Sequence, residues 1–327
     1  MAKIVLGVGT SHSPMLSTRP EQWPEHTKRD YANSALWAWD GKPHDFPELA
    51  AMTPAAVAVE SSPDSWARRH AACQDGIARL AQVISDANPD VLVVVGDDQK
   101  EVISDANMPA MLVYWGDTVM NRPRDPQRLP PSIRLAQWSN EFEEPREFPV
   151  QSDLALHIIE SLMNDEFDLA HSKMLPEGHG EGHAFGFIHR RILEGRQVPM
   201  VPIMLNTYYP PTQPTPNRCY NLGVGLKKAI ESWPTDARVA VLASGGLSHF
   251  VIDETLDRAV LAALENKDDA YLRHIPTNLL NAGNSEIRNW IAVAGAVSDL
   301  NFHLVDYVPC YRSEAATGCA MGFAYWD

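Results

Sequence analysis

The chain has 327 residues, of which 45% are hydrophobic and 21% are charged, a balance that indicates a globular protein with a sizeable core and excludes a disordered one. Its 27 basic and 42 acidic residues give a net charge of -15, which disfavours nucleic acid and anionic membrane surfaces as partners. The N-terminus lacks a signal-peptide pattern, no apolar run approaches the roughly 20 residues that span a bilayer, and the four cysteines are not spaced as CxxC, so we expect a cytoplasmic protein with reduced thiols.

Four short apolar runs predict buried β-strands. They are rich in β-branched residues, and they cover residues 3–8, 90–95, 198–205 and 238–243. Apolar residues at helical spacing predict helices between these runs, at 65–88, 219–233 and 252–265, and Pro89 and Pro234 end the first two. The alternation of strands and helices predicts an α/β fold in which helices cover a central sheet.

Two stretches, at about 19–63 and 122–149, combine prolines with many charged residues, and we expect them to be irregular insertions. Long loops of this kind are often lids or substrate walls in enzymes, although they can equally cover the core or build an oligomer interface. The sequence has no internal repeat and no linker, so we expect a single domain over residues 1–327.

Three candidate sites follow predicted strands. His12 follows the first strand in GTSHSP, Asp97-Asp98-Gln99 follow the second, and His249 follows the fourth in ASGGLSHF. Sites in open α/β sheets form at the carboxyl ends of strands, so these residues could meet at one edge. The structural alternative is a turn histidine for His12 and a capped turn for the acidic pair.

Two further candidates lie outside the strand ends. His179 and His183 occur in LPEGHGEGHAFGF, where the glycines allow close approach of a ligand but disfavour the helix that a zinc-binding HExxH motif needs. Glu286 lies in the first turn of a helix predicted to begin near Ser285, where it could stabilise the helix dipole or bind a metal. Histidine, carboxylate and amide donors with spare histidines are the inventory of a non-haem Fe(II) oxygenase.

GTSHSP, HAFGF, SGGLSH and SEIRNWIAV occur in the order found in class III extradiol dioxygenases, and the chain resembles that family from residue 3 to about 300. The family includes the catalytic subunit of protocatechuate 4,5-dioxygenase, gallate dioxygenase and 2,3-dihydroxyphenylpropionate dioxygenase. The segments VGDDQ, NMPA and YWG look like its 3-O-methylgallate dioxygenase branch. The resemblance implies a central mixed sheet flanked by helices, an Fe(II) centre, and a homodimer or larger assembly.

The resemblance also implies roles for individual residues. His12 and Glu286 match metal ligands, and His183 and His249 match catalytic residues, one acting as base and the other as acid, in an order that stays open. Where the family has a second metal-binding histidine, this chain has Gln99. Three outcomes follow: Gln99 completes the iron site, Asp98 completes it instead, or the site binds metal poorly.

The activity that the resemblance implies is extradiol cleavage of a catechol-type ring, such as gallate or 3-O-methylgallate, with O2 as the second substrate. A substrate carboxylate would need a cationic partner, and the sequence does not choose among Arg19, Arg29, Arg122, Arg124 and Arg312. The alternatives are a metal-dependent hydrolase on the same fold and a non-enzymatic relative that has lost its metal.

Overall fold

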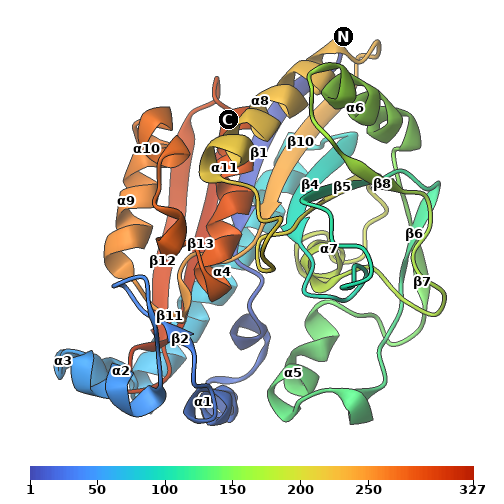
Figure 1. Ribbon diagram of the computed structural model, residues 1–327. Helices are drawn as coiled ribbons and strands as arrows, with labels where there is room; N and C mark the ends of the chain where they lie inside the picture. The colour runs from blue at the N-terminus through green and yellow to red at the C-terminus, as the bar shows by residue number, and fades with distance from the viewer.

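A nine-stranded mixed sheet runs through the computed structural model, which describes residues 1–327 (Figure 1). The strand order is β11-β13-β1-β10-β4-β9-β5-β8, and β12 pairs with β13. The strands are β1 (Lys3–Thr10), β4 (Val91–Asp97), β5 (Met111–Tyr114), β8 (Ala170–Ser172), β9 (Met200–Leu205), β10 (Arg238–Ser244), β11 (His249–Val251), β12 (Phe302–Tyr311) and β13 (Thr317–Trp326). The predicted α/β fold with a central mixed sheet flanked by helices is confirmed.

The four strands predicted from apolar runs form the parallel centre of this sheet. β1 pairs with β10, β10 with β4, and β4 with β9, all in parallel. In β4, Val93 and Val95 belong to one hydrophobic core, while Leu92 and Val94 belong to the other. Burial on both faces explains the unbroken apolar runs, and parallel pairing places the carboxyl ends of all four strands at one edge.

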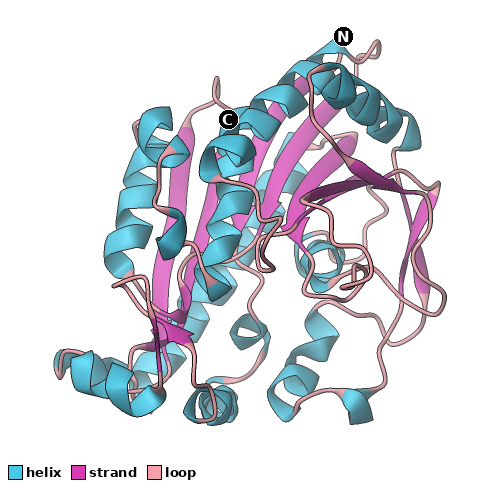
Figure 2. Cartoon of the chain, viewed as in Figure 1, coloured by secondary structure: helices cyan, strands magenta, loops and turns pink.

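Helices cover both faces of the sheet (Figure 2). One face carries the larger core, which includes residues of α6 (Ser152–Asn164), α8 (Pro216–Ser232), α9 (Glu254–Glu265), α10 (Asp269–Arg273) and α11 (Ile287–Ala296). The other face carries the smaller core, with α4 (Pro63–Ala87), α7 (His183–Phe187) and a π-helical turn at Ile188–Ile192. These clusters contain 46 and 29 buried residues, so each face has its own core.

The two proline-rich stretches contain short elements rather than loops alone. They hold α1 (Trp23–Tyr31), β2 (Leu36–Trp37), β3 (Pro43–His44), α2 (Phe46–Met52), α3 (Ala56–Glu60), α5 (Pro131–Ala136) and β7 (Arg146–Pro149), which pairs with β6 (Thr118–Asn121). Prolines occupy the first turns of α1, α2 and α5, where a missing N–H is not needed. Figure 1 shows α1 and α5 beyond the edge at which the parallel strands end.

The remaining sequence expectations concern membranes and thiols. None of the helices combines the length and apolar character that crossing a membrane requires. All four cysteines are free and buried, and no pair forms a disulfide.

Candidate metal centre and substrate cavity

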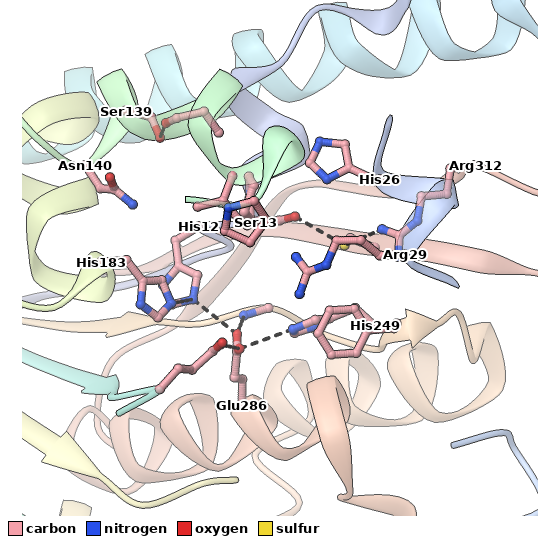
Figure 3. A pocket seen from close by; sticks show the side chains of 18 of the residues that line it. His12, Ser13, His26, Arg29, Ser139, Asn140, His183, His249, Glu286 and Arg312 are labelled. Carbon is pink, nitrogen blue, oxygen red and sulfur yellow. Dashed lines mark hydrogen bonds and ion pairs between the residues drawn. The ribbon is translucent and has the colours of Figure 1, made fainter. Parts of the chain in front are cut away.

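Four side chains converge at the carboxyl edge of the parallel strands, and Figure 3 shows three of them, His12, His183 and Glu286. His12 Nε2 lies 3.2 Å from His183 Nε2, 3.3 Å from Glu286 Oε2 and 3.7 Å from Asp97 Oδ1. His183 Nε2 lies 3.9 Å from Asp97 Oδ2. Donor atoms that bind one ion at about 2.0–2.2 Å are themselves separated by roughly 3–4 Å. The donor atoms of His12, Asp97 and His183 all lie within 4.8 Å of one another and fit around a single cation, and Glu286 lies beside His12.

The hydrogen bonds of His12 present a lone pair to this cluster. Its Nδ1 lies 3.0 Å from the Ser244 hydroxyl, which donates its only proton to the carbonyl oxygen of Ala184 at 2.7 Å. The hydroxyl oxygen must therefore accept the proton of His12 Nδ1. The neutral ring then carries no proton on Nε2, and this is the tautomer that binds a metal.

Glu101 holds His183 in the matching orientation. Its carboxylate accepts the Nδ1 proton of His183 at 2.6 Å and the backbone N–H of the same residue at 3.1 Å. Burial opposes the charged forms, yet each group stabilises the other, so the pKa of His183 rises to about 10 and that of Glu101 falls to about 2. With both Nδ1 atoms occupied, the two facing Nε2 atoms need a proton or a cation between them.

The two carboxylates of the cluster lack lysine and arginine partners. Asp97 is 0% exposed and Glu286 is 1% exposed. Glu286 accepts hydrogen bonds from the Gly246 N–H at 2.6 Å and the Tyr208 hydroxyl at 2.8 Å. Burial, and then the charge of Glu286, raises the pKa of Asp97 to about 6. Two buried acids in contact with histidine lone pairs are what a cation would stabilise, so the residues fit a metal.

The residues after β4 take three different positions. Asp98 turns away and accepts the backbone N–H groups of Val102 at 3.0 Å and Ile103 at 3.1 Å, which is the turn role given as its structural alternative. Gln99 is exposed at the rim, and its Nε2 lies 3.4 Å from Glu286 Oε1. Asp97, a candidate from its place after the second predicted strand but not one of the predicted ligands, faces His12. Its signal was an acid that closes a fully buried strand.

His249 lies on the cavity side of Glu286. Its Nδ1 donates to the Leu247 carbonyl oxygen at 2.8 Å, and its Nε2 lies 3.2 Å from Glu286 Oε1 and 3.3 Å from the Tyr208 hydroxyl. Burial lowers the pKa of His249, but the charge of Glu286 outweighs it and raises that pKa to about 10. Tyr208 follows β9, the third predicted strand, but was not among the residues predicted for the site.

A cavity of about 550 Å³ is bordered on this side by His12, Gln99, Glu101, His183, His249 and Glu286. Its other walls come from both proline-rich stretches, which contribute His26, Arg29, Asn33, Ile133, Ala136 and Asn140. Of the five candidate arginines, Arg29, Arg124 and Arg312 line this cavity. Arg122 lines a second, more polar cavity that adjoins it. His179 lies in that second cavity and not in the metal cluster.

Fold and site together define an α/β protein with a cluster of histidines and carboxylates at the carboxyl edge of its parallel strands, in which His12, Asp97 and His183 could hold a metal ion. A profile of the family described as the catalytic LigB subunit of aromatic ring-opening dioxygenase matches residues 52–316. The chain belongs to this family, which confirms the resemblance to class III extradiol dioxygenases.

Curated relatives agree with this family. Gallate dioxygenase of Pseudomonas putida is 38% identical over 122 residues, which are 36% of this chain and 34% of the relative. The 2,3-dihydroxyphenylpropionate/2,3-dihydroxicinnamic acid 1,2-dioxygenase of Comamonas testosteroni is 31% identical over 100 residues, 31% of this chain and 30% of the relative. Its Cupriavidus necator counterpart is 33% identical over 105 residues, with the same coverage. The chain thus matches 34% or less of each relative's length.

Proposed function

We propose that this protein is an extradiol dioxygenase that uses Fe(II) and O2 to open a catechol-type ring, with gallate, 3-O-methylgallate or a related compound as substrate. Membership of the family and the names of its relatives support this class of reaction. The observation that carries the proposal is the His12 lone pair facing two buried carboxylates at the end of a cavity. We further propose a single catalytic domain that works in the cytoplasm as a homodimer or larger assembly.

His12 and Glu286 are the proposed metal ligands, as the resemblance implies. For the third position we propose Asp97 in place of Gln99, because Asp97 is buried and faces His12 while Gln99 is exposed at the rim. When bound there, Fe(II) would act as a Lewis acid that lowers the pKa of a substrate hydroxyl, and it would supply open positions for substrate and O2.

His249 is proposed as the general base. Its Nδ1 is engaged with the Leu247 carbonyl, and its Nε2 lies on the cavity side, 3.2 Å from Glu286 Oε1. Once a bound metal shares the charge of Glu286, Nε2 is the atom that would take a proton from a substrate hydroxyl. His183 is proposed as the acid. Its partner Glu101 is not a proposed metal ligand, so the full negative charge of Glu101 keeps His183 protonated. The partner of His249 is Glu286, and a bound metal would share the charge of that carboxylate.

Oxygen uptake by anaerobically Fe(II)-loaded protein tests the proposal, with gallate, 3-O-methylgallate, protocatechuate and catechol as substrates. Iron-dependent uptake that yields a ring-opened product is expected with at least one of them. Turnover that needs no oxygen and proceeds with Zn²⁺ would identify a hydrolase instead. A protein that retains no iron would favour a relative that has lost its metal and its catalysis.

A further inference from the structure

The charged groups of the cavity are paired, with one exception. Arg312 is buried and donates to both carboxylate oxygens of Asp30 at 2.7 Å. Arg124 pairs with Glu141 at 2.5 Å and lies 3.5 Å from Glu101. The acids of the metal cluster face histidines. Among the ionised side chains that line the cavity, only Arg29 has neither an ion pair nor a side-chain hydrogen bond.

Arg29 lies on α1 with its guanidinium directed into the cavity, and its neighbours leave it available. Figure 3 shows it on the opposite side of the pocket from the backbone of Glu286. Asp30, the next residue, is already occupied by Arg312. Burial, and then the charges of Arg312 and Arg29, lower the pKa of His26 to about 3, so His26 stays neutral and adds no second positive charge. This end of the cavity therefore holds one uncompensated positive charge.

We propose that Arg29 binds the carboxylate of the aromatic substrate and thereby selects ring acids over uncharged catechols. The inference rests on the proposed function, because it places the substrate's diol at the metal centre and its carboxylate at α1. A guanidinium binds a carboxylate through two parallel, charge-assisted hydrogen bonds, and it stays charged at any working pH. The cavity volume of about 550 Å³ lies within the roughly 300–1,000 Å³ of small-molecule sites.

Arg29 also lies ahead of residues 52–316, the part that the family profile matches. The proposed specificity is therefore a property of the N-terminal stretch of this chain, whose α1 forms one wall of the cavity. Removing the charge should weaken binding of substrates that carry a carboxylate and spare those that lack one.

Two pairs of compounds that differ only in a carboxylate provide the test: gallate with pyrogallol, and protocatechuate with catechol. Dissociation constants would be measured anaerobically by titration of Fe(II)-loaded protein, and KM values by oxygen uptake. Arg29→Gln should raise both constants for the two acids by about ten- to a hundredfold and leave those for pyrogallol and catechol within about twofold. Arg29→Lys keeps the positive charge but not the two parallel N–H donors, so it should recover part of the lost affinity.

Arg134→Gln is the matched control. Arg134 is an exposed arginine on α5, the helix that forms another wall, but it does not line the cavity. This variant loses the same charge and should bind all four compounds as the wild type does.

Three results would overturn the proposal: no change in Arg29→Gln, an equal loss for acids and neutral compounds, or a wild type that binds pyrogallol as tightly as gallate. Failure of the proposed function looks different. The wild type would then bind acids in an Arg29-dependent manner and yet consume no oxygen with any of the four compounds.

Discussion

The third metal ligand depends on which of two neighbouring side chains completes the His12–Glu286 pair. We expect Asp97→Ala to lower bound iron at least tenfold, because it removes a buried carboxylate oxygen that lies 3.7 Å from His12 Nε2. Gln99→Ala should retain near-stoichiometric iron, because Gln99 is exposed at the rim. Metal analysis after anaerobic loading and desalting checks both, with circular dichroism to confirm folding. The reverse pattern would show that the position implied by the family resemblance is the ligand.

Replacement of the two proposed proton carriers should separate catalysis from metal binding. His249→Ala and His183→Ala are expected to keep iron and lose turnover by about 10²–10⁴-fold, the range of general acid–base catalysis. Steady-state oxygen uptake gives the turnover, and iron content gives the control. A His183→Ala protein without iron would instead make His183 a ligand, which its 3.2 Å approach to His12 would accommodate. Full activity in both variants would rule out the acid–base assignment.

The sequence allowed some residues of the site to be predicted and not others. His12, His183, His249 and Glu286 stood out because each lies in a glycine-rich turn, at a strand end or at a helix start, and the structure brings all four together. The residues that hydrogen-bond to these four side chains could not be recognised from the sequence. Glu101, Tyr208 and Ser244 act on partners far along the chain, for example across 82 residues between Glu101 and His183. Nothing in the local pattern marks such a pairing.

Strands could likewise be predicted where their own composition marks them, and not where their burial depends on neighbouring elements. The four central strands were predictable because burial on both faces makes each a continuous apolar run. The long β12–β13 hairpin was missed. β12 is mostly part-exposed, and β13 reads TGCAMGFAYW, in which small residues replace the β-branched ones that mark a strand. Its burial comes from neighbouring elements rather than from its own composition.

Helix α9 stabilises the turn that carries His249. Its buried Asp257 accepts the Ser248 N–H at 2.8 Å, the Ser248 hydroxyl at 2.5 Å and the Tyr307 hydroxyl at 2.8 Å. Burial outweighs these bonds and raises the pKa of Asp257 to about 7. The folded protein therefore binds this proton more tightly than the unfolded chain, whose aspartate has a pKa of about 3.9. Stability from this group is fully present below pH 4 and is lost as the pH rises through 7.

The Asp257→Asn variant isolates this effect, because it removes the titrating group while keeping the shape. The unfolding free energy of the wild type, relative to Asp257→Asn, should fall by up to about 1.4 kcal/mol per pH unit between pH 4 and 7. Urea unfolding of both proteins across this range measures the difference. A difference that does not change with pH would show that Asp257 is ionised throughout and that its hydrogen bonds suffice to stabilise the charge.

For the molecule as a whole, the sequence left open what the two proline-rich stretches do. The sequence shows their composition but not where they pack, because a lid, a core cover and an oligomer interface can have the same composition. The structure places α1 and α5 beside the cavity, so that residues 19–63 and 122–149 contribute walls to it. This arrangement depends on long-range packing, such as the contact of the Arg312 guanidinium with Asp30, 282 residues apart.

The metal centre should also determine the stability of the entire fold. Asp97 and Glu286 are both buried, and the charge of Glu286 raises the pKa of Asp97. A bound cation would stabilise the folded state alone, by about 4 kcal/mol at a free concentration of 1,000 Kd. We expect chelation to lower the melting temperature of wild-type protein and Fe(II) to restore it. The gain should shrink as the pH falls through about 6, where a proton on Asp97 competes with the metal for its carboxylate. Anaerobic calorimetry with and without metal, at pH 5 and pH 7.5, measures it. His12→Ala should melt at the same temperature in both states, and a metal-dependent rise in that variant would place the stabilising ion at another site.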